Sequence, residues 1–177
     1  MNGQQGGGTA GTSNATNNLS TPEAVKAAAA QFLEACRTGD DSTATLMLSS
    51  VTREKLAELG GTAQPPASDT ARFELGEVKF QDANTALVVC KWTDLDETGQ
   101  PQTDHAQWAL RREPAGWRIA GVAYQVFEDL APVLLDFEKP EELRQKQQQL
   151  RDLIARRMQQ QSQRQAIAPN PQNTDLR

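Results

Sequence analysis

The segment Asp94-Leu95-Asp96-Glu97-Thr98-Gly99 holds the densest group of residues that could do chemistry. Its letters follow the pattern D-x-D-x-T, in which one carboxylate can attack a phosphorus atom and a second can transfer a proton. The same letters match the start of a calcium-binding loop, which needs alternating oxygen ligands and a glycine at its sixth position. Phosphoryl transfer and calcium binding are therefore the two chemistries to weigh against the surrounding sequence.

The surrounding sequence favours neither chemistry. Aspartate-nucleophile phosphatases need a parallel α/β sheet with a later lysine and further carboxylates for magnesium, whereas a hairpin follows Asp94 here. The calcium loop needs a bidentate glutamate at its twelfth position, which is His105. We therefore predict a polar hairpin turn with Gly99 in the left-handed conformation, no catalytic residue and no cofactor. We also expect no metal site, with Asp94 and Asp96 as candidates only for a weak calcium contact.

The single histidine, His105, follows Asp104 directly, which suggests an acid–base pair. Neighbouring residues of a strand point to opposite faces, however, so Asp104 cannot orient His105. By the same alternation His105 shares a face with Gln107, whereas Asp104 shares one with Trp108. Solvent-exposed strand positions explain both residues without any chemistry.

Four aromatic residues of the predicted strands could either fill a core or line a hydrophobic pocket: Trp92, Trp108, Trp117 and Tyr124. Our candidates for pocket-lining residues are Trp92, Asp104, Trp108 and Tyr124. If Trp108 faces inward, Asp104 is the carboxylate nearer the mouth of this pocket.

The two cysteines, Cys36 and Cys90, occupy apolar positions of predicted elements. We expect buried thiols, and a disulfide between helix and sheet is the alternative. Without a C-x-x-C pair, the sequence indicates neither a zinc site nor a redox dithiol.

The elements that must position these residues are helices first and strands second. A capping signature at Ser20–Glu23 begins an amphipathic helix that ends at Gly39, and two shorter helical segments follow before Gly60. From Thr70 the apolar period changes to two, with a phase slip at Gly76 that indicates a β-bulge. Short turns separate four strands, which predicts an α+β fold with helices packed on one face of a curved, antiparallel four-stranded sheet.

This order of elements resembles the nuclear transport factor 2-like superfamily, the cone-shaped α+β fold shared with ketosteroid isomerases and polyketide cyclases. The residues that carry the resemblance are Pro22-Glu23-Ala24-Val25, Phe32-Leu33, Arg37-Thr38-Gly39-Asp40 and Gly116-Trp117-Arg118-Ile119. The stretches Trp92-Thr93-Asp94 and Leu110 to Ile119 also look like those of bacterial domains without an assigned activity. Isomerase chemistry would need a base Asp, a Tyr and a protonated Asp, and the sequence shows no pair of buried acids for it.

The chain divides by composition into four parts. Residues 1–20 are rich in Gly, Asn, Thr, Ser and Gln and predict a disordered linker, and residues 21–137 form the α+β domain. Residues 138–165 predict a long polar helix with a thin apolar stripe, and residues 166–177 a disordered tail. A flexible tether at the start favours an exported or envelope-tethered lipoprotein, its leader removed, over a cytoplasmic protein.

The net charge and hydropathy of the chain limit the classes of partner that we expect. The net charge is -5 and the globular part has no basic stripe, which argues against nucleic acid, and no apolar run is long enough for an integral membrane segment. We expect a protein partner or self-association through the C-terminal helix or the sheet, or a small apolar ligand. The sequence thus predicts a non-catalytic binding module, with a small-molecule enzyme or carrier of the isomerase or cyclase kind as the alternative.

Overall fold

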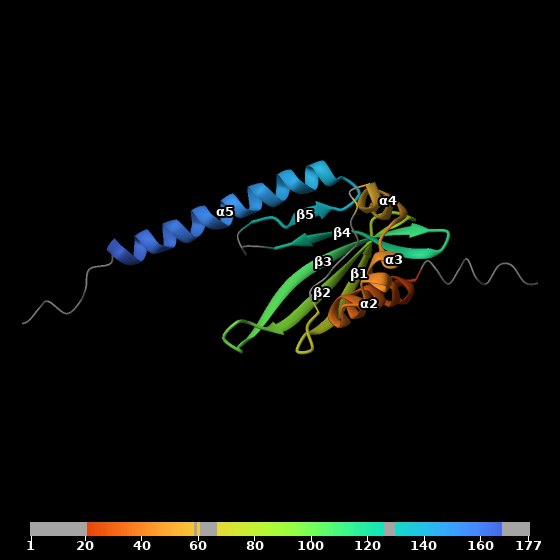
Figure 1. Ribbon diagram of the computed structural model, residues 1–177, viewed down its shortest axis with the longest axis horizontal. Helices are drawn as coiled ribbons and strands as arrows, with labels where there is room; N and C mark the ends of the chain where they lie inside the picture. The colour runs from red at the N-terminus through yellow and green to blue at the C-terminus, as the bar shows by residue number, and fades with distance from the viewer. Residues whose placement is uncertain (1–20, 59, 61–66, 126–129, 168–177) are drawn as a thin grey trace, which may run out of the picture.

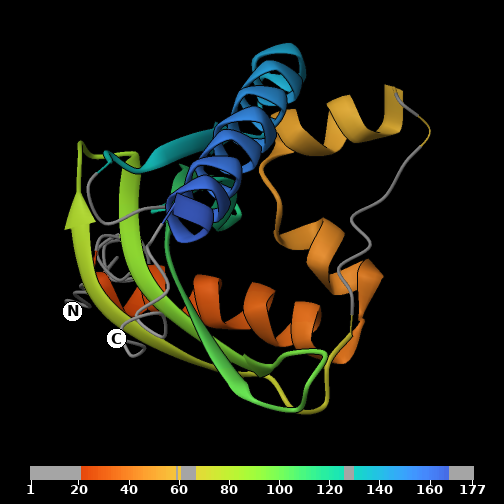
Figure 2. The ribbon, with the colours of Figure 1, turned by 90° about the vertical axis from the view of Figure 1, so that its left-hand side faces the viewer.

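A computed structural model describes residues 21–58, 60, 67–125 and 130–167 of the 177-residue chain. The predicted linker, residues 1–20, and most of the predicted tail, residues 168–177, lie outside the described residues. The described part is an α+β structure in which the N-terminal helix lies in the hollow of one curved sheet (Figure 2).

Helix α2, Pro22–Thr38, is the amphipathic helix that the sequence predicts. The side chain of Thr21, rather than that of Ser20, caps it by accepting from the backbone N–H of Ala24 at 3.2 Å. Gly39 ends it in the left-handed conformation, at φ 69°. Its buried face turns toward the sheet and consists of Val25, Ala29, Phe32, Leu33 and Ala35.

Two short helices, α3 (Asp41–Met47) and α4 (Ser50–Glu58), follow α2. The turn between them is tied to the sheet, because the backbone N–H of Ser49 donates to the Ile119 carbonyl at 2.8 Å. At the start of α4, the Glu113 carboxylate accepts from both the N–H (2.7 Å) and the hydroxyl (2.9 Å) of Ser50. A carboxylate at a helix N-terminus opposes the positive end of the helix dipole, so this contact joins α4 to the strands.

The sheet is antiparallel throughout and its strands follow in chain order, as the sequence predicts. It contains β1 (Arg72–Phe80), β2 (Thr85–Leu95), β3 (Pro101–Glu113), β4 (Gly116–Tyr124) and β5 (Val133–Asp136).

The prediction of four strands is wrong, because Val133–Asp136 forms a fifth strand, β5, that pairs with β4. Without it, β4 would expose a row of unpaired backbone groups. Leu135 pairs with Val122 across this edge and is buried. Gly121 permits the close approach, since a Cβ there would lie 2.6 Å from the carbonyl oxygen of Leu135.

Two register shifts bend the sheet around α2. One lies between Leu75 and Val78, where the phase slip at Gly76 predicts a bulge, and the other between Ala109 and Leu110. Figure 2 shows β1, β2 and β3 curling past α2 so that the helix lies on the inner face. The main core fills this hollow, and its members include Phe32, Leu33, Val88, Leu110, Trp117 and Ile119.

Helix α5, Pro140–Ile167, leaves the end of β5 and extends past the sheet (Figure 1). It continues two residues beyond the predicted end at residue 165. Near its start, Leu143 packs against Val122 and Leu135, and the Lys146 ammonium donates to the Leu134 carbonyl at 3.0 Å. In the described part of the chain, none of the helices combines the length and apolar character that crossing a bilayer requires.

Candidate functional site

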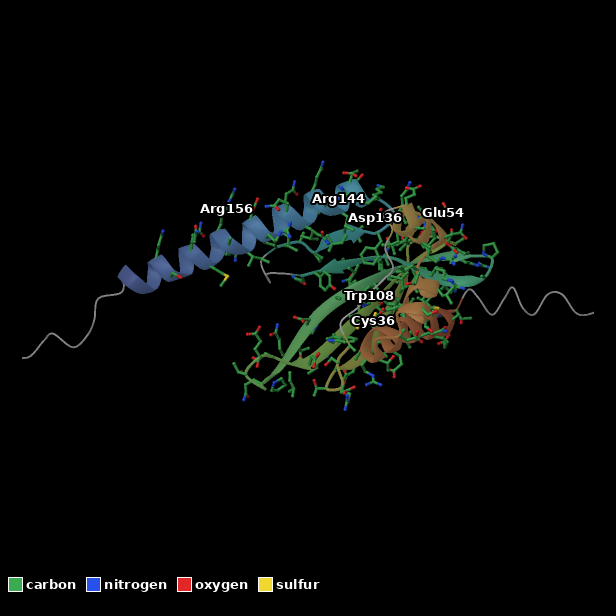
Figure 3. All side chains as sticks on the ribbon, viewed as in Figure 1. Cys36, Glu54, Trp108, Asp136, Arg144 and Arg156 are labelled. Carbon is green, nitrogen blue, oxygen red and sulfur yellow. The ribbon has the colours of Figure 1, made fainter. Side chains whose placement is uncertain are left out.

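A cavity of about 520 Å³ lies between α2 and the inner face of the sheet. Ligand pockets of small proteins have volumes of roughly 300–1,000 Å³, so this cavity has room for a small organic molecule. In Figure 3, Trp108 of β3 and Cys36 of α2 mark its sheet wall and its helix wall.

The sheet wall consists of side chains that alternate along β2 and β3. Trp92 lies opposite Asp104 in the register, and Cys90 lies opposite Ala106. Since alternate residues of a strand share a face, these pairs and Trp108 all project into the cavity. Tyr124 of β4, which lies opposite Ala106, completes the wall. The four predicted pocket residues, Trp92, Asp104, Trp108 and Tyr124, therefore come together around one cavity.

The opposite wall comes from α2 and from the segment before β1. Leu33 and Cys36 lie three residues apart and share a helix face. Ala67 and Ser68 close the side, where the N–H of Ser68 donates to the Arg37 carbonyl at 3.0 Å. No local pattern distinguishes Ala67 and Ser68 from any other loop residues, whereas alternation from Trp92 and Trp108 could have identified Cys90 and Ala106.

Each tryptophan of the sheet pairs with a phenylalanine, but only two of the three tryptophans line the cavity. Trp92 stacks on Phe73 with ring centroids 6.2 Å apart, and Trp108 meets Phe32 edge-on at 5.2 Å. Trp117 instead lies in the buried core, tilted against Phe80 at 6.0 Å, which is the core alternative that the sequence left open for it. Aromatic pairs of this geometry prefer defined orientations, so the two cavity rings are held by the core behind them.

The two carboxylates at the cavity differ in their hydrogen bonds. Asp94 Oδ1 accepts from the hydroxyls of Thr70 (2.5 Å) and Ser68 (2.9 Å) and from the N–H of Leu95 (2.8 Å). The hydroxyl donors, Thr70 first, lower the pKa of Asp94. Asp94 thus fastens the loop at residues 68–70 to β2, and its charge serves that structural contact.

Asp104 is exposed at the cavity rim, and only a long contact of 3.4 Å from the side-chain amide of Gln102 reaches it among the hydrogen bonds between described residues. Its negative charge acts on Tyr124: burial raises the pKa of the Tyr124 phenol, and the nearby Asp104 carboxylate raises it further. The tyrosine therefore stays protonated, and its O–H is available as a donor in the cavity.

The second aspartate of the D-x-D-x-T pattern, Asp96, is a turn residue. Its Oδ1 accepts from the N–H and hydroxyl of Thr98 (2.8 and 2.7 Å) and from the N–H of Gln100 (2.9 Å), while Gly99 adopts φ 78°. The polar hairpin turn with a left-handed glycine is thus confirmed. Within the described ranges, no group of three His, Cys, Asp or Glu side chains has an arrangement that could hold a metal ion.

The two cysteines are free and both line the cavity. Burial raises the pKa of Cys36 and of Cys90 to about 11 each, and hydrogen bonding from Trp108 opposes the shift at Cys90. At neutral pH both are therefore protonated thiols, which are poor nucleophiles and behave as small apolar groups.

His105 lies on the opposite face of the sheet from Asp104, as strand alternation predicts. It lines a separate hollow of about 200 Å³, together with Val89, Gln107 and Ala123. The sheet separates the histidine from the carboxylate that precedes it, so they form no acid–base pair.

No protein-family model and no curated protein matches the chain. The solved structures similar to it include a ketosteroid isomerase-like protein from Erwinia carotovora atroseptica SCRI1043, 20% identical, and the association domain of C. elegans CaMKII, 15% identical. Both have a TM-score of 0.40, and each match covers 56% of this chain and 91% of the other. Neither similarity indicates a ligand, partner or activity for this chain.

Proposed function

We propose that the chain is a non-catalytic binding module that holds a small, mostly apolar molecule in the cavity between α2 and the sheet. The observation that carries this proposal is the cavity itself, about 520 Å³ in volume, with Leu33, Ala106 and Trp108 among its apolar lining. Its polar side chains are few and include Asp94, Asp104, Ser68 and the hydroxyl of Tyr124, which is the usual composition of a small-molecule site.

The chemistry of the lining favours binding over catalysis. The isomerase mechanism that the family resemblance implies needs a carboxylic acid that stays protonated, which requires a raised pKa. Asp94, the more enclosed acid, has a lowered pKa because hydroxyl groups donate to it. Cys36 and Cys90, with pKa values of about 11, offer no thiolate nucleophile at neutral pH.

A neutral probe, 2-(1-naphthyl)ethanol, tests the proposal by isothermal titration calorimetry. Ala106 lies on the cavity wall and Ala109 on the outer face of the same strand, so Ala106→Phe fills the cavity and Ala109→Phe is its matched control. We expect Ala106→Phe to weaken probe binding by at least about tenfold and Ala109→Phe to change it by less than about twofold. A second variant, Trp92→Ala, removes lining without overpacking it and should also weaken binding.

Circular dichroism and thermal unfolding establish that each variant folds before its affinity is compared. If folded Ala106→Phe binds the probe as well as the parent protein does, the cavity is not the binding site and the proposal is wrong.

A proton-transfer enzyme is the second candidate, and the electrostatic coupling of Asp104 with Tyr124 favours it. In that role Asp104 would remove a proton next to a ketone and the Tyr124 hydroxyl would donate to the carbonyl oxygen. Deuterium exchange at the α-carbon of a cyclic ketone, followed by NMR, measures this activity. Exchange that the protein accelerates, and that Asp104→Asn and Tyr124→Phe both abolish, would replace the non-catalytic proposal.

Self-association through α5 is the interaction role we propose beside ligand binding. The helix extends past the sheet (Figure 1), and along its apolar stripe Met158 is 63% exposed. Sedimentation of the full chain and of a truncation that removes Glu141 onward tests this self-association. Ile154→Glu is the point variant, and Gln148→Glu is its control on the polar face of the helix. An unchanged oligomeric state in the truncation and in Ile154→Glu would show that α5 is not the contact.

A further inference from the structure

The polar part of the cavity lining is acidic. Two carboxylates, Asp94 and Asp104, are among the described residues that line it, and those residues include no Lys, Arg or His. Aromatic rings lie on the same wall: Trp92 is the cross-strand partner of Asp104, and Tyr124 is close enough for the Asp104 charge to raise the pKa of its phenol. A rim that combines a carboxylate with aromatic faces is suited to a positive charge.

Asp104 is the carboxylate that is available to a ligand. Asp94 already accepts from two hydroxyls and one N–H, whereas a single 3.4 Å amide contact reaches Asp104. Among the described residues no cation lies within ion-pair distance of Asp104. The chain as a whole carries a net charge of -5, which also attracts cations rather than anions.

We infer that the natural ligand of the cavity is an organic cation, an ammonium group on an aromatic or aliphatic body. The body occupies the apolar interior beside Leu33, Ala106 and Trp108, and the ammonium lies at the rim between the Asp104 carboxylate and the ring of Trp92. This inference rests on the proposed function, because it specifies the charge of the molecule that the cavity holds.

Three probes with the same naphthalene ring and different charge test the inference: 2-(1-naphthyl)ethylamine, a cation, 2-(1-naphthyl)ethanol, which is neutral, and 1-naphthylacetate, an anion. Calorimetric titration of the full chain at pH 7 should give an amine affinity about tenfold higher than that of the alcohol, with the acetate weakest. Added salt should reduce the preference for the amine, because Asp104 is exposed and screened.

Asp104→Asn removes the rim charge and should lower the ratio of amine to alcohol affinity to about one. Glu97→Gln is the matched control, since it removes the same charge from the exposed end of the β2–β3 hairpin outside the cavity lining. The control should keep the preference for the amine.

The outcomes of these titrations distinguish the inferred charge of the ligand from the proposed binding function. Equal binding of amine and alcohol, tighter binding of the acetate, or a preference that persists in Asp104→Asn overturns the inferred charge of the ligand while the binding function stands. Failure of all three probes to bind the parent protein counts against the binding function itself, and the inference falls with it.

Discussion

The two faces of the sheet carry different side chains although they share the same strands. On the inner face of β3, Asp104, Ala106 and Trp108 line the cavity of about 520 Å³. On the outer face of the same strand, His105 and Gln107 line a hollow of about 200 Å³. Alternation along one strand thus sends the carboxylate and the histidine of one dipeptide to separate environments.

The difference between the two faces shows that a cavity requires a second wall opposite the sheet. Helix α2 places Leu33 and Cys36 opposite the inner face, so apolar side chains enclose the space from both sides. A pocket forms where two layers approach each other but do not fill the gap between them, and the bends of the strands at Leu75/Val78 and Ala109/Leu110 contribute to that gap.

Of the expected effects that distinguish the two faces of the sheet, the largest is on the free energy of unfolding. Leu110 is fully buried on the inner face and Leu87 is half-buried on the outer face, so the same truncation to Ala probes both. We expect Leu110→Ala to lower the free energy of unfolding by about 2–5 kcal/mol, because it removes buried methyl groups and leaves a cavity. Leu87→Ala should cost less than about half of that amount. Urea unfolding measures both, and equal losses would contradict the assignment of the core to the inner face.

The cavity thiols provide the next largest effect. With pKa values of about 11, Cys36 and Cys90 should react with iodoacetamide at pH 8 about a hundredfold more slowly than in the unfolded chain, where the thiolate fraction is larger. The rate should rise about tenfold for each pH unit toward 11. Because the unfolded thiols ionise first, the free energy of unfolding should also fall between about pH 9 and pH 11.

Mass spectrometry of the alkylated peptides assigns the rate to each cysteine. The double variant Cys36→Ser, Cys90→Ala is the control for the pH dependence of stability, and it should lose the part of the decline that the thiols cause. Rapid labelling of both cysteines at pH 8 in the folded protein would show that the helix wall does not pack as described.

A smaller, local effect is expected at Asp94, which fastens residues 68–70 to β2. Asp94→Ala should speed hydrogen exchange at the amides of Ser68 and Leu95, because the carboxylate no longer accepts from that loop and that turn. In the parent protein the carboxylate contact is present above the ordinary pKa of 3.8 and is lost as the pH falls through the lowered value of the folded state.

Asp82→Ala is the matched control, because Asp82 Oδ1 also accepts a backbone N–H, that of Asn84 at 2.7 Å, in the turn after β1. It should loosen its own turn and leave the exchange at Ser68 unchanged. Faster exchange at Ser68 in the control would mean that the loop depends on the whole sheet rather than on Asp94.

The smallest effect tests the outer face. His105→Ala should change the affinity for the naphthalene probes by less than about twofold, because the imidazole lies on the far side of the sheet from the cavity. Calorimetric titration of the variant measures this affinity. A larger loss of affinity would show that the probes bind on the outer face and would contradict the distinction between the two faces of the sheet.

Much of the fold could be predicted from the sequence, because local patterns decide it. The apolar period of Val25 to Cys36 predicts α2, and the phase slip at Gly76 predicts the first bend of the sheet. Alternation from Trp108 also predicts that Asp104 and His105 lie on opposite faces. These features depend only on residues near each other in the chain, which is why the sequence contains them.

The fifth strand, the place of Trp117 and the loop wall of the cavity could not be predicted in this way. Val133–Asp136 reads as an apolar patch, and it becomes a strand only because β4 presents an unpaired edge. Trp92 and Trp117 both lie on strands and both contact a phenylalanine. Trp117 is buried in the core whereas Trp92 lines the cavity, and the neighbouring sequence does not predict that difference.

The sequence by itself determined the element types, the order of the first four strands and the face of each strand residue, because helix and strand periods are properties of the local chain. The tertiary structure decided which faces enclose a space: the distance between α2 and the sheet, the docking of Ala67 and Ser68, and the approach of Asp104 to Tyr124. These depend on packing between segments far apart in the chain, where a gap of a few side chains separates a filled core from a cavity.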